Sequence, residues 1–117
     1  MGGRKEVRHT SKFYFTYGTS DKFPYQGGWT EIEAENYSRA VIAFRNFHPY
    51  GNRNTINCEA SFDEEKWQVT GRAQANSIYG HGCRERITVT VEKEPYYEDQ
   101  GNVALIVEHI SYSRTIL

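Results

Sequence analysis

The sequence predicts an α+β domain with a mainly antiparallel sheet of about five strands, one principal helix packed on one face and a second short helix. Two observations lead to this fold class. Apolar and polar residues alternate in four short segments, as in half-buried strands, and one other segment repeats its apolar residues at helical spacing. The 117 residues suffice for one core, so we expect a single domain over residues 12–117 after a polar, flexible leader over residues 1–11.

The first two strands are predicted at residues 12–17 and 29–34. The alternation directs three side chains of each strand toward the core: Phe13, Phe15 and Tyr17, then Thr30, Ile32 and Ala34. Between the strands lies a segment rich in Gly, Thr, Ser, Asp and Pro that ends in Gly27 and Gly28, which is typical of a long loop. We expect the two strands to pair as a hairpin.

The principal helix is predicted at residues 37–47. Its apolar residues form one stripe: Tyr37, Ala40, Val41, Phe44 and Phe47. Asn36 is a good N-cap residue before this stripe. The helix should end near Phe47, because Pro49 disfavours helical geometry at His48.

The second half of the chain is predicted to add three strands and the short helix. Residues 56–62 alternate, with an inner face of Ile56, Cys58, Ala60 and Phe62. Acidic residues at the start of residues 63–67 favour a short helix, capped by Ser61 or Asp63. Residues 83–92 alternate again, with an inner face of Cys83, Glu85, Ile87, Val89 and Val91. Residues 94–102 indicate a connection, and residues 103–112 a last strand.

Charge and hydropathy exclude several classes of protein. The chain has 14 Lys and Arg against 15 Asp and Glu, so it lacks the basic excess of a general nucleic-acid-binding protein, although a local basic patch remains open. It has no apolar run of membrane-spanning length, and its first residues lack the apolar centre of a signal peptide. We therefore expect a cytoplasmic protein with no membrane contact and with two reduced cysteines.

The ligand types of a zinc site are present in His48, Cys58, His81 and Cys83. Their spacing matches no familiar zinc finger, because the chain has no Cys-x-x-Cys pair and both cysteines fall on predicted core faces. Buried reduced thiols are the simpler interpretation, so we expect no metal and no cofactor, with His48, Cys58 and Cys83 as the candidate ligands if a metal binds. A small cysteine enzyme with a histidine base stays open as an alternative, but we expect no enzyme and assign no catalytic residue.

A better functional signal is the aromatic content, with nine Tyr and two Trp. Several of these residues lie in predicted loops or on a polar strand face: Tyr25, Trp29, Tyr50, Tyr79, Tyr96 and Tyr97. Because Tyr, Trp and Arg are enriched at binding hot spots, we predict a binding surface formed by Tyr25, Trp29, Tyr79, Arg84 and Arg86. The alternative is that the loops fold their rings over the sheet edges and that the arginines pair with nearby glutamates.

Four segments resemble a family of small proteins encoded by phages and mobile elements of gut Firmicutes: residues 15–19 (FTYGT), 23–34 (FPYQGGWTEIEA), 44–49 (FRNFHP) and 56–58 (INC). In that family an aromatic strand, a Gly-Gly-Trp turn, a helix ending in His-Pro, an Asn-Cys strand and a late cysteine follow in this order. The resemblance covers about residues 13–87, and residues 92–117 lie outside it. The family's late motif usually contains Cys-His-Glu, whereas this chain has Cys83, Arg84 and Glu85.

The resemblance implies a genomic setting rather than a reaction. Small phage accessory proteins often bind host proteins or signals, so we expect this protein to bind a bacterial host protein or a signalling nucleotide in the host cytoplasm. The activity we expect is inhibition of a bacterial defence system, as by an anti-CRISPR protein. A nucleic-acid or nucleotide-binding module is the alternative, with rings stacked on bases and arginines on phosphates. The last strand is either covered internally or pairs across a homodimer, and we favour the homodimer.

Overall fold

The computed structural model describes residues 4–5, 9–49, 57–69, 82–97, 101 and 103–117. These residues form an α+β fold with the following elements in chain order: β1 (Arg4–Lys5), β2 (Ser11–Tyr17), β3 (Trp29–Ala34), α1 (Tyr37–Phe47), β4 (Cys58–Asp63), α2 (Glu64–Val69), β5 (Cys83–Tyr97) and β6 (Val103–Ile116). The predicted order of two strands, a helix, a strand, a short helix and two strands is confirmed. β1 is an addition, because it lies in the segment predicted as a flexible leader and pairs with Glu92 and Lys93 of β5.

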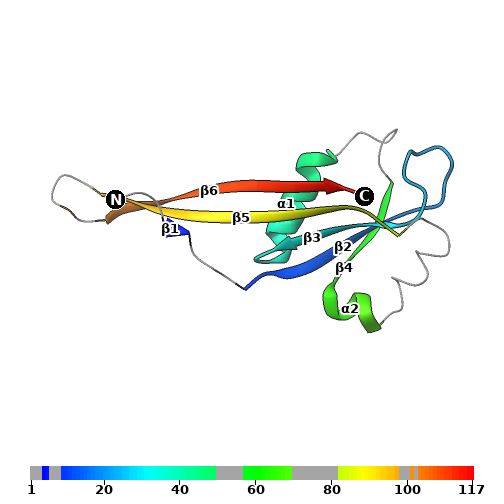
Figure 1. The fold of residues 1–117 in the computed structure, drawn as a ribbon, viewed down its shortest axis with the longest axis horizontal. Coiled ribbons are helices and arrows are strands. Elements are labelled where there is room, and N and C mark those ends of the chain that lie inside the picture. Colours follow the sequence, from blue (N-terminus) through cyan, green and yellow to red (C-terminus); the bar gives the residue numbers. More distant parts are fainter. Residues whose placement is uncertain (1–3, 6–8, 50–56, 70–81, 98–100, 102) are drawn as a thin grey trace.

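The strands of the described residues belong to one mixed sheet (Figure 1). Their order across the sheet is β4–β2–β3–β5–β6, and β1 lies beside β5 beyond the end of β3. The β3–β5 pair is parallel and the other pairs are antiparallel, so the prediction of a mainly antiparallel sheet is confirmed. The predicted hairpin of the first two strands is the β2–β3 pair.

The main core lies between the sheet and α1. It contains Phe13, Phe15, Tyr17, Ile32, Ala34, Ala40, Ala43, Phe44, Ile87 and Val89. The rings of Phe15 and Phe44 stack with their centroids 4.3 Å apart. α1 begins as predicted, because the Asn36 side chain accepts a hydrogen bond from the backbone N–H of Arg39 at 2.9 Å. Tyr37 departs from the predicted stripe, since it is exposed at the start of the helix, with its ring at the edge of Phe13.

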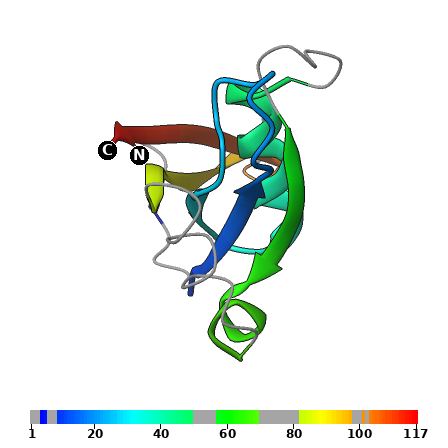
Figure 2. The same cartoon turned by 90° about the vertical axis from the view of Figure 1, so that its right-hand side faces the viewer.

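Part of the opposite face of the sheet is covered too, which the alternation does not predict. Tyr14 and Thr16 are buried, although they alternate with the core residues of β2. The physical reason is α2, whose buried Trp67 stacks on the Tyr14 ring at 4.6 Å. Asp63 caps this helix by accepting a hydrogen bond from the backbone N–H of Lys66 at 2.8 Å. Figure 2 looks along the molecule and shows α1 and α2 at different places around the twisted sheet.

β4 departs from its prediction at one point. Its register with β2 shifts, so that Thr16 lies opposite Ala60 while Tyr17 lies opposite Cys58. An extra residue in one strand moves the residues after it to the other face of the sheet. Cys58 therefore packs against the main core, whereas Phe62 contacts Trp67. The prediction that Cys58, Ala60 and Phe62 share one inner face is wrong, and Ile56 lies outside the described residues.

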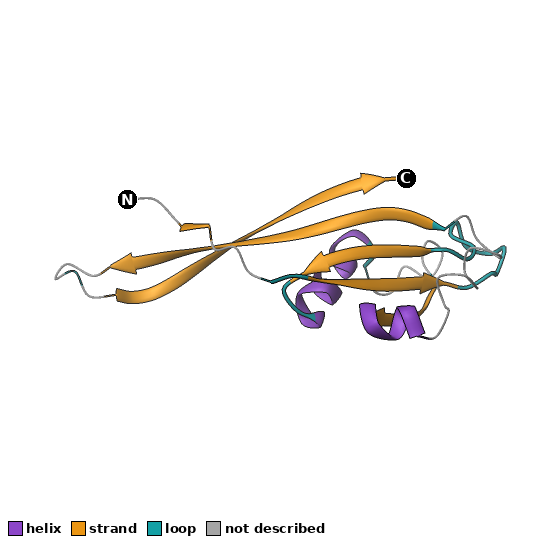
Figure 3. Cartoon of the chain, turned by 60° about the horizontal axis from the view of Figure 1, so that its bottom comes forward, coloured by secondary structure: helices purple, strands orange, loops and turns teal. Residues whose placement is uncertain are grey.

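β5 and β6 form a hairpin that extends beyond the rest of the sheet (Figures 1 and 3). We call its outer part, residues 92–97 and 103–109, the hairpin arm. β5 continues to Tyr97, so the predicted connection over residues 94–102 is wrong in its first part, and β6 continues past Tyr112 to Ile116. The extents of 60 × 30 × 20 Å and the radius of gyration of 17.5 Å, against about 13 Å for a compact chain of this length, reflect this arm.

Pro95 explains why the arm escapes prediction. A proline is normally a reason to end a strand, because it lacks an N–H. Here the N–H of Leu117 donates to the carbonyl oxygen of Arg84 at 2.8 Å, and the β5–β6 register then runs without a shift as far as Tyr96. In an antiparallel pair, residues whose main-chain groups point toward the partner strand alternate with residues whose main-chain groups point away from it. Counting from Arg84, the main chain of Pro95 points away from β6, so the missing N–H interrupts no bond between the two strands.

Candidate functional site

Two of the predicted binding residues hold the loop between β2 and β3 in place. Arg84 donates from Nε to the carbonyl oxygen of Gly27 at 3.0 Å and from NH2 to that of Gln26 at 2.9 Å. Its guanidinium also lies over the Tyr25 ring, 5.3 Å from the centroid. Tyr25 is half-buried, with its ring edge-on to Tyr17 at 4.8 Å. These contacts make Tyr25 and Arg84 packing residues of the loop, which leaves less of each side chain available to a partner.

The glycines of the same loop have a steric role. Gly28 has a φ of +78°, and a Cβ at this position would lie 2.5 Å from the carbonyl oxygen of Gly82. Any residue other than glycine would therefore collide with backbone as well as adopt an unfavourable conformation. This close approach brings β3 and β5 together next to Trp29 and explains the Gly-Gly-Trp sequence without a ligand.

The other described members of the predicted set, Trp29 and Arg86, make different contacts. Trp29 is half-buried and meets Trp67 edge-on at 5.2 Å, so it belongs to the packing under α2. Arg86 is exposed and pairs with Glu31 at 3.1 Å. Tyr79 lies outside the described residues. Among the described members of the predicted set, the structure thus brings Tyr25 and Arg84 together and places Trp29 and Arg86 in other contacts.

The candidate metal ligands are separated by the sheet. Cys58 packs on the main-core side, as does His48, whose ring lies against Phe44 and Tyr17. Cys83 lies opposite Trp29, because the β3–β5 register shifts before Thr30 meets Glu85. Its charged neighbours are Glu31 and Arg86. The prediction that Cys83 shares the core face of Ile87 is therefore wrong. The described residues contain no group of three or more His, Cys, Asp or Glu side chains arranged to hold a metal ion.

Both thiols are in environments that disfavour a thiolate. Burial is the main cause that raises the pKa of Cys58 and of Cys83 above the ordinary thiol value. Each sulfur also donates to a backbone carbonyl oxygen, Cys58 to Ala60 at 3.5 Å and Cys83 to Glu85 at 3.2 Å. A reactive cysteine needs a lowered pKa and an electropositive setting. The geometry gives neither thiol the features of a nucleophile.

The most connected group of polar residues surrounds Glu85, and the sequence patterns did not predict it. This carboxylate is 0% exposed and lies near the start of β5. Its Oε1 accepts hydrogen bonds from His48 Nε2 at 2.5 Å and from Thr30 Oγ1 at 3.1 Å. Its Oε2 accepts two from Arg114, from Nε at 2.7 Å and from NH2 at 2.6 Å. The Tyr17 hydroxyl lies 2.5 Å from Thr30 Oγ1, so the cluster joins β2, β3, the end of α1, β5 and β6.

The cluster keeps Glu85 charged inside the protein. Burial alone would raise the pKa of this carboxyl group, but the hydrogen bonds from His48 and Arg114 outweigh burial and hold the pKa below its ordinary value. Both carboxylate oxygens are occupied by protein donors, so the arrangement ties elements together and offers no free group to a substrate. One signal was visible in the sequence: Glu85 stands on a strand face that is otherwise apolar, where a charge requires partners.

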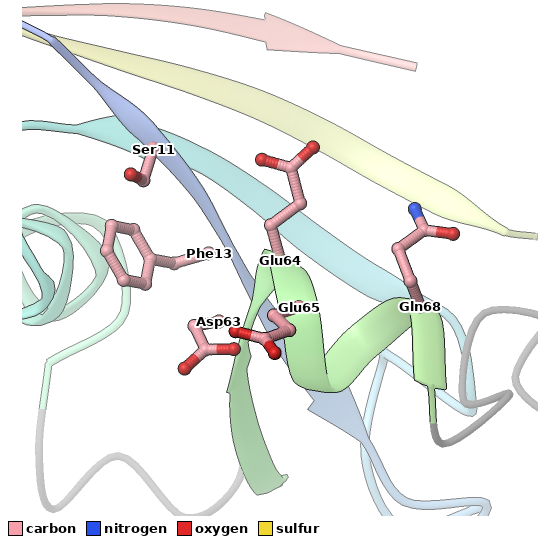
Figure 4. A pocket seen from close by; sticks show the side chains of 6 residues that line it. All are labelled: Ser11, Phe13, Asp63, Glu64, Glu65 and Gln68. Atoms are coloured by element: carbon pink, nitrogen blue, oxygen red, sulfur yellow. The ribbon is translucent and has the colours of Figure 1, made fainter.

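The described surface has an open hollow of about 470 Å³ beside α2 (Figure 4). It is lined by Ser11, Phe13, Asp63, Glu64, Glu65 and Gln68. The Glu64 side chain points away from those of Asp63 and Glu65, and one Asp63 oxygen is already bonded to the backbone of Lys66. The carboxylates therefore do not converge on one point, and the hollow does not define a ligand site.

The hairpin arm and the end of β6 carry large apolar side chains in contact with solvent. Tyr96 and Tyr97 are 62% and 56% exposed, and more than two-fifths of each of the following is exposed: Leu105, Ile106, Ile110, Ile116 and Leu117. Tyr96 and Tyr97 are among the aromatic residues that the sequence places outside the core. This combination of a projecting two-stranded hairpin and uncovered apolar side chains is the main surface feature of the described residues.

The fold and these surfaces define a small α+β protein with a helix-covered body and an exposed hairpin arm. No family model matches the chain, and no curated protein or solved structure matches it either. Neither helix of the described residues has the length and apolar content needed to cross a membrane.

Proposed function

We propose that this protein acts by binding another protein through the arm tyrosines, Tyr96 and Tyr97. The observation that carries the proposal is their position: both rings are more than half exposed, and they lie near the outer end of a hairpin whose inner half is fixed in the body of the protein. Tyrosine provides large contact area with few rotatable bonds, so it binds a partner at low entropic cost. A fixed hairpin presents these rings without a further folding step.

The charges near the tyrosines favour a protein over a nucleic acid or a nucleotide. The arm carries three carboxylates, of Glu92, Glu94 and Glu108, against one lysine, Lys93, so it lacks the basic excess that phosphate binding requires. The arginines that the sequence offers to phosphate are engaged elsewhere, Arg84 by two carbonyl oxygens and Arg86 by Glu31. Protein binding therefore ranks ahead of the nucleotide-binding alternative.

The biological role we propose is inhibition of a bacterial defence system by occlusion of a host protein. The resemblance of residues 13–87 to small phage and mobile-element proteins supports this setting. The arm tyrosines lie outside that resemblance, so the part of the chain that we expect to choose the partner is particular to this protein.

The test is a plaque assay on bacteria that carry single, defined defence systems and express this protein. We expect the wild type to restore phage growth on at least one such strain. The double variant Tyr96→Ala, Tyr97→Ala should reduce the number of restored plaques at least tenfold. The matched control is Val69→Ala, which removes an exposed apolar side chain from α2, an element that Figure 1 shows away from the outer end of the hairpin. It should keep the full effect.

Three results would count against the proposal. Failure of the wild type on every strain would remove the role in defence inhibition. Full activity of the tyrosine double variant would remove the arm as the binding site. Binding of the purified protein to nucleic acid, with an affinity that falls steeply as the salt concentration rises, would favour the nucleic-acid alternative.

A further inference from the structure

The outer edge of β6 is an open strand edge. Among the described residues, β5 is the strand that pairs with β6, and it does so along one side only. The bond from Leu117 N–H to the Arg84 carbonyl oxygen directs the main chain of Leu117 toward β5. By the alternation of an antiparallel pair, the main-chain groups of six residues then point away from β5: Ile106, Glu108, Ile110, Tyr112, Arg114 and Ile116.

We propose that this edge pairs with the same edge of a second copy, forming a two-fold symmetric dimer with β6 antiparallel to its partner and Ser111 on the two-fold axis. This inference concerns an edge other than the one that carries Tyr96 and Tyr97, so it goes beyond the proposed function. The main-chain groups that point away from β5 in one copy can bond to those of the other copy only if the two-fold axis passes through a residue of β6 rather than between two residues. The possible centres are therefore few.

Charge selects the centre at Ser111. There, Glu108 lies opposite the partner's Arg114, and by symmetry this pair of opposite charges occurs twice. A centre at Glu108 or at Arg114 would place like charges directly opposite each other, which is destabilising. Of the centres from 108 to 114, the centre at Ser111 is the one that pairs Glu108 with Arg114.

The same register also matches the apolar residues of the edge. Ile110 lies opposite the partner's Tyr112, and Ile106 lies opposite the partner's Ile116. Ile110 is 41% exposed, and Tyr112 packs on the Phe47 ring at 5.9 Å. The contact between the two β6 strands, which we call the seam, would therefore extend the main core from one copy to the other. Six outward residues on each strand form about twelve main-chain hydrogen bonds, which is within the range of stable interfaces.

The charged residues of the seam are already ordered in the single chain. Glu108 bonds to Arg39 of α1 and lies 3.9 Å from Lys93. Arg114 is held by Glu85 and lies over the Phe47 ring, 4.9 Å from the centroid. Because these side chains lose little freedom on association, they favour one register at low entropic cost.

A cysteine at the axis tests the register directly. Ser111 forms a non-hydrogen-bonded pair with its own copy, in which the Cα atoms lie about 4.5 Å apart and a disulfide fits. We expect Ser111→Cys to form a covalent dimer under mild oxidation, seen on a non-reducing gel. The matched control is Ser113→Cys, whose two copies would lie roughly 13 Å apart along the strands and should stay unlinked. The wild type, whose two cysteines are partly buried, is the background control.

Light scattering of the wild type completes the test. We expect a particle of twice the 13.6 kDa chain mass, held without any disulfide. A wild type that stays at the mass of one chain at high micromolar concentration would overturn the dimer. A dimer in which Ser113→Cys links as readily as Ser111→Cys would overturn the register. Neither result depends on the tyrosines of the arm, so it leaves the proposed function to its own test.

Discussion

The body of the protein and the hairpin arm share the same two strands, yet the strands bury their side chains in opposite ways. In the body, Glu85, Ile87 and Val89 of β5 are buried under α1 between two neighbouring strands. In the arm, Tyr96 and Tyr97 of the same strand lie more than half exposed. Exposure along β5 is therefore decided by what covers the strand rather than by the apolar character of its residues.

This difference shows where each region obtains its stability. In the body, α1 covers one face of the sheet, α2 covers part of the other face, and an ionic cluster is buried, so the interior can hold the body together alone. Beyond β1, which pairs with Glu92 and Lys93, the arm is a two-stranded ribbon with exposed faces, and such a ribbon is marginal by itself in water. The arm keeps its shape because it continues strands that the body fixes, and its exposed side chains gain burial only from a partner. We assign stability to the body and binding to the arm.

The most severe way to break the body is to remove the charge of Glu85. Glu85→Gln would leave Arg114 and His48 without their buried carboxylate, and loss of one partner of a buried ion pair costs about 3–5 kcal/mol. Chemical denaturation should show a fall of about this size in the free energy of unfolding. Glu94→Gln, which alters an exposed carboxylate bonded to His109, should cost less than about 1 kcal/mol. Equal effects of the two variants would contradict a special role for the cluster.

Acid should weaken the body through the same carboxylate. The pKa of Glu85 in the folded state lies below its ordinary value of 4.5, so the unfolded chain takes up this proton first as the pH falls. The stability that the charge contributes is complete above that ordinary value and is lost as the pH drops through the folded-state pKa. Denaturation of the wild type and of Glu85→Gln between pH 7 and pH 3 should show their difference shrinking in acid. A difference that stays constant would mean that the carboxylate charge is not what stabilises the body.

Sequence reasoning succeeded where the residues repeat regularly. The alternation in β2, β3 and β5 and the stripe of α1 gave the element order and the main core, because each of these elements buries one face against a common interior. It failed at two register shifts, where one extra residue turned Phe62 and Cys83 to the other face. Such shifts depend on the neighbouring strand, which local patterns do not contain.

The candidate site was predicted less well for a related reason. Tyr25 and Trp29 are residue types common at binding surfaces, but Tyr25 packs against His48 and Trp29 against Trp67 of α2. The cluster around Glu85 depends on residues from five elements distant in the chain. A charge on an apolar face indicates that partners exist, but it does not identify His48 and Arg114 as those partners.

A smaller effect distinguishes the two arginines next to Glu85. Arg84→Ala would remove the guanidinium that holds the carbonyl oxygens of Gln26 and Gly27, at a cost of about 2 kcal/mol. Hydrogen exchange should show faster exchange of the Gly27 amide, whose N–H now bonds to the Gly18 carbonyl oxygen at 2.7 Å. Arg86→Ala, which loses one exposed pair with Glu31, should change stability by less than about 1 kcal/mol and leave that amide protected. Faster exchange in both variants would show that the loop is not held by Arg84 in particular.

The smallest expected effect on stability belongs to the arm tyrosines, and it separates binding from folding most sharply. Tyr96→Ala, Tyr97→Ala removes two rings that contribute little to the core, so the free energy of unfolding should change by less than about 0.5 kcal/mol. Tyr14→Ala removes one ring of the same kind that is buried and stacked on Trp67, and should cost about 3 kcal/mol. If the arm variant unfolds as readily as Tyr14→Ala, the arm tyrosines support the fold, and the division between a stable body and a binding arm is wrong.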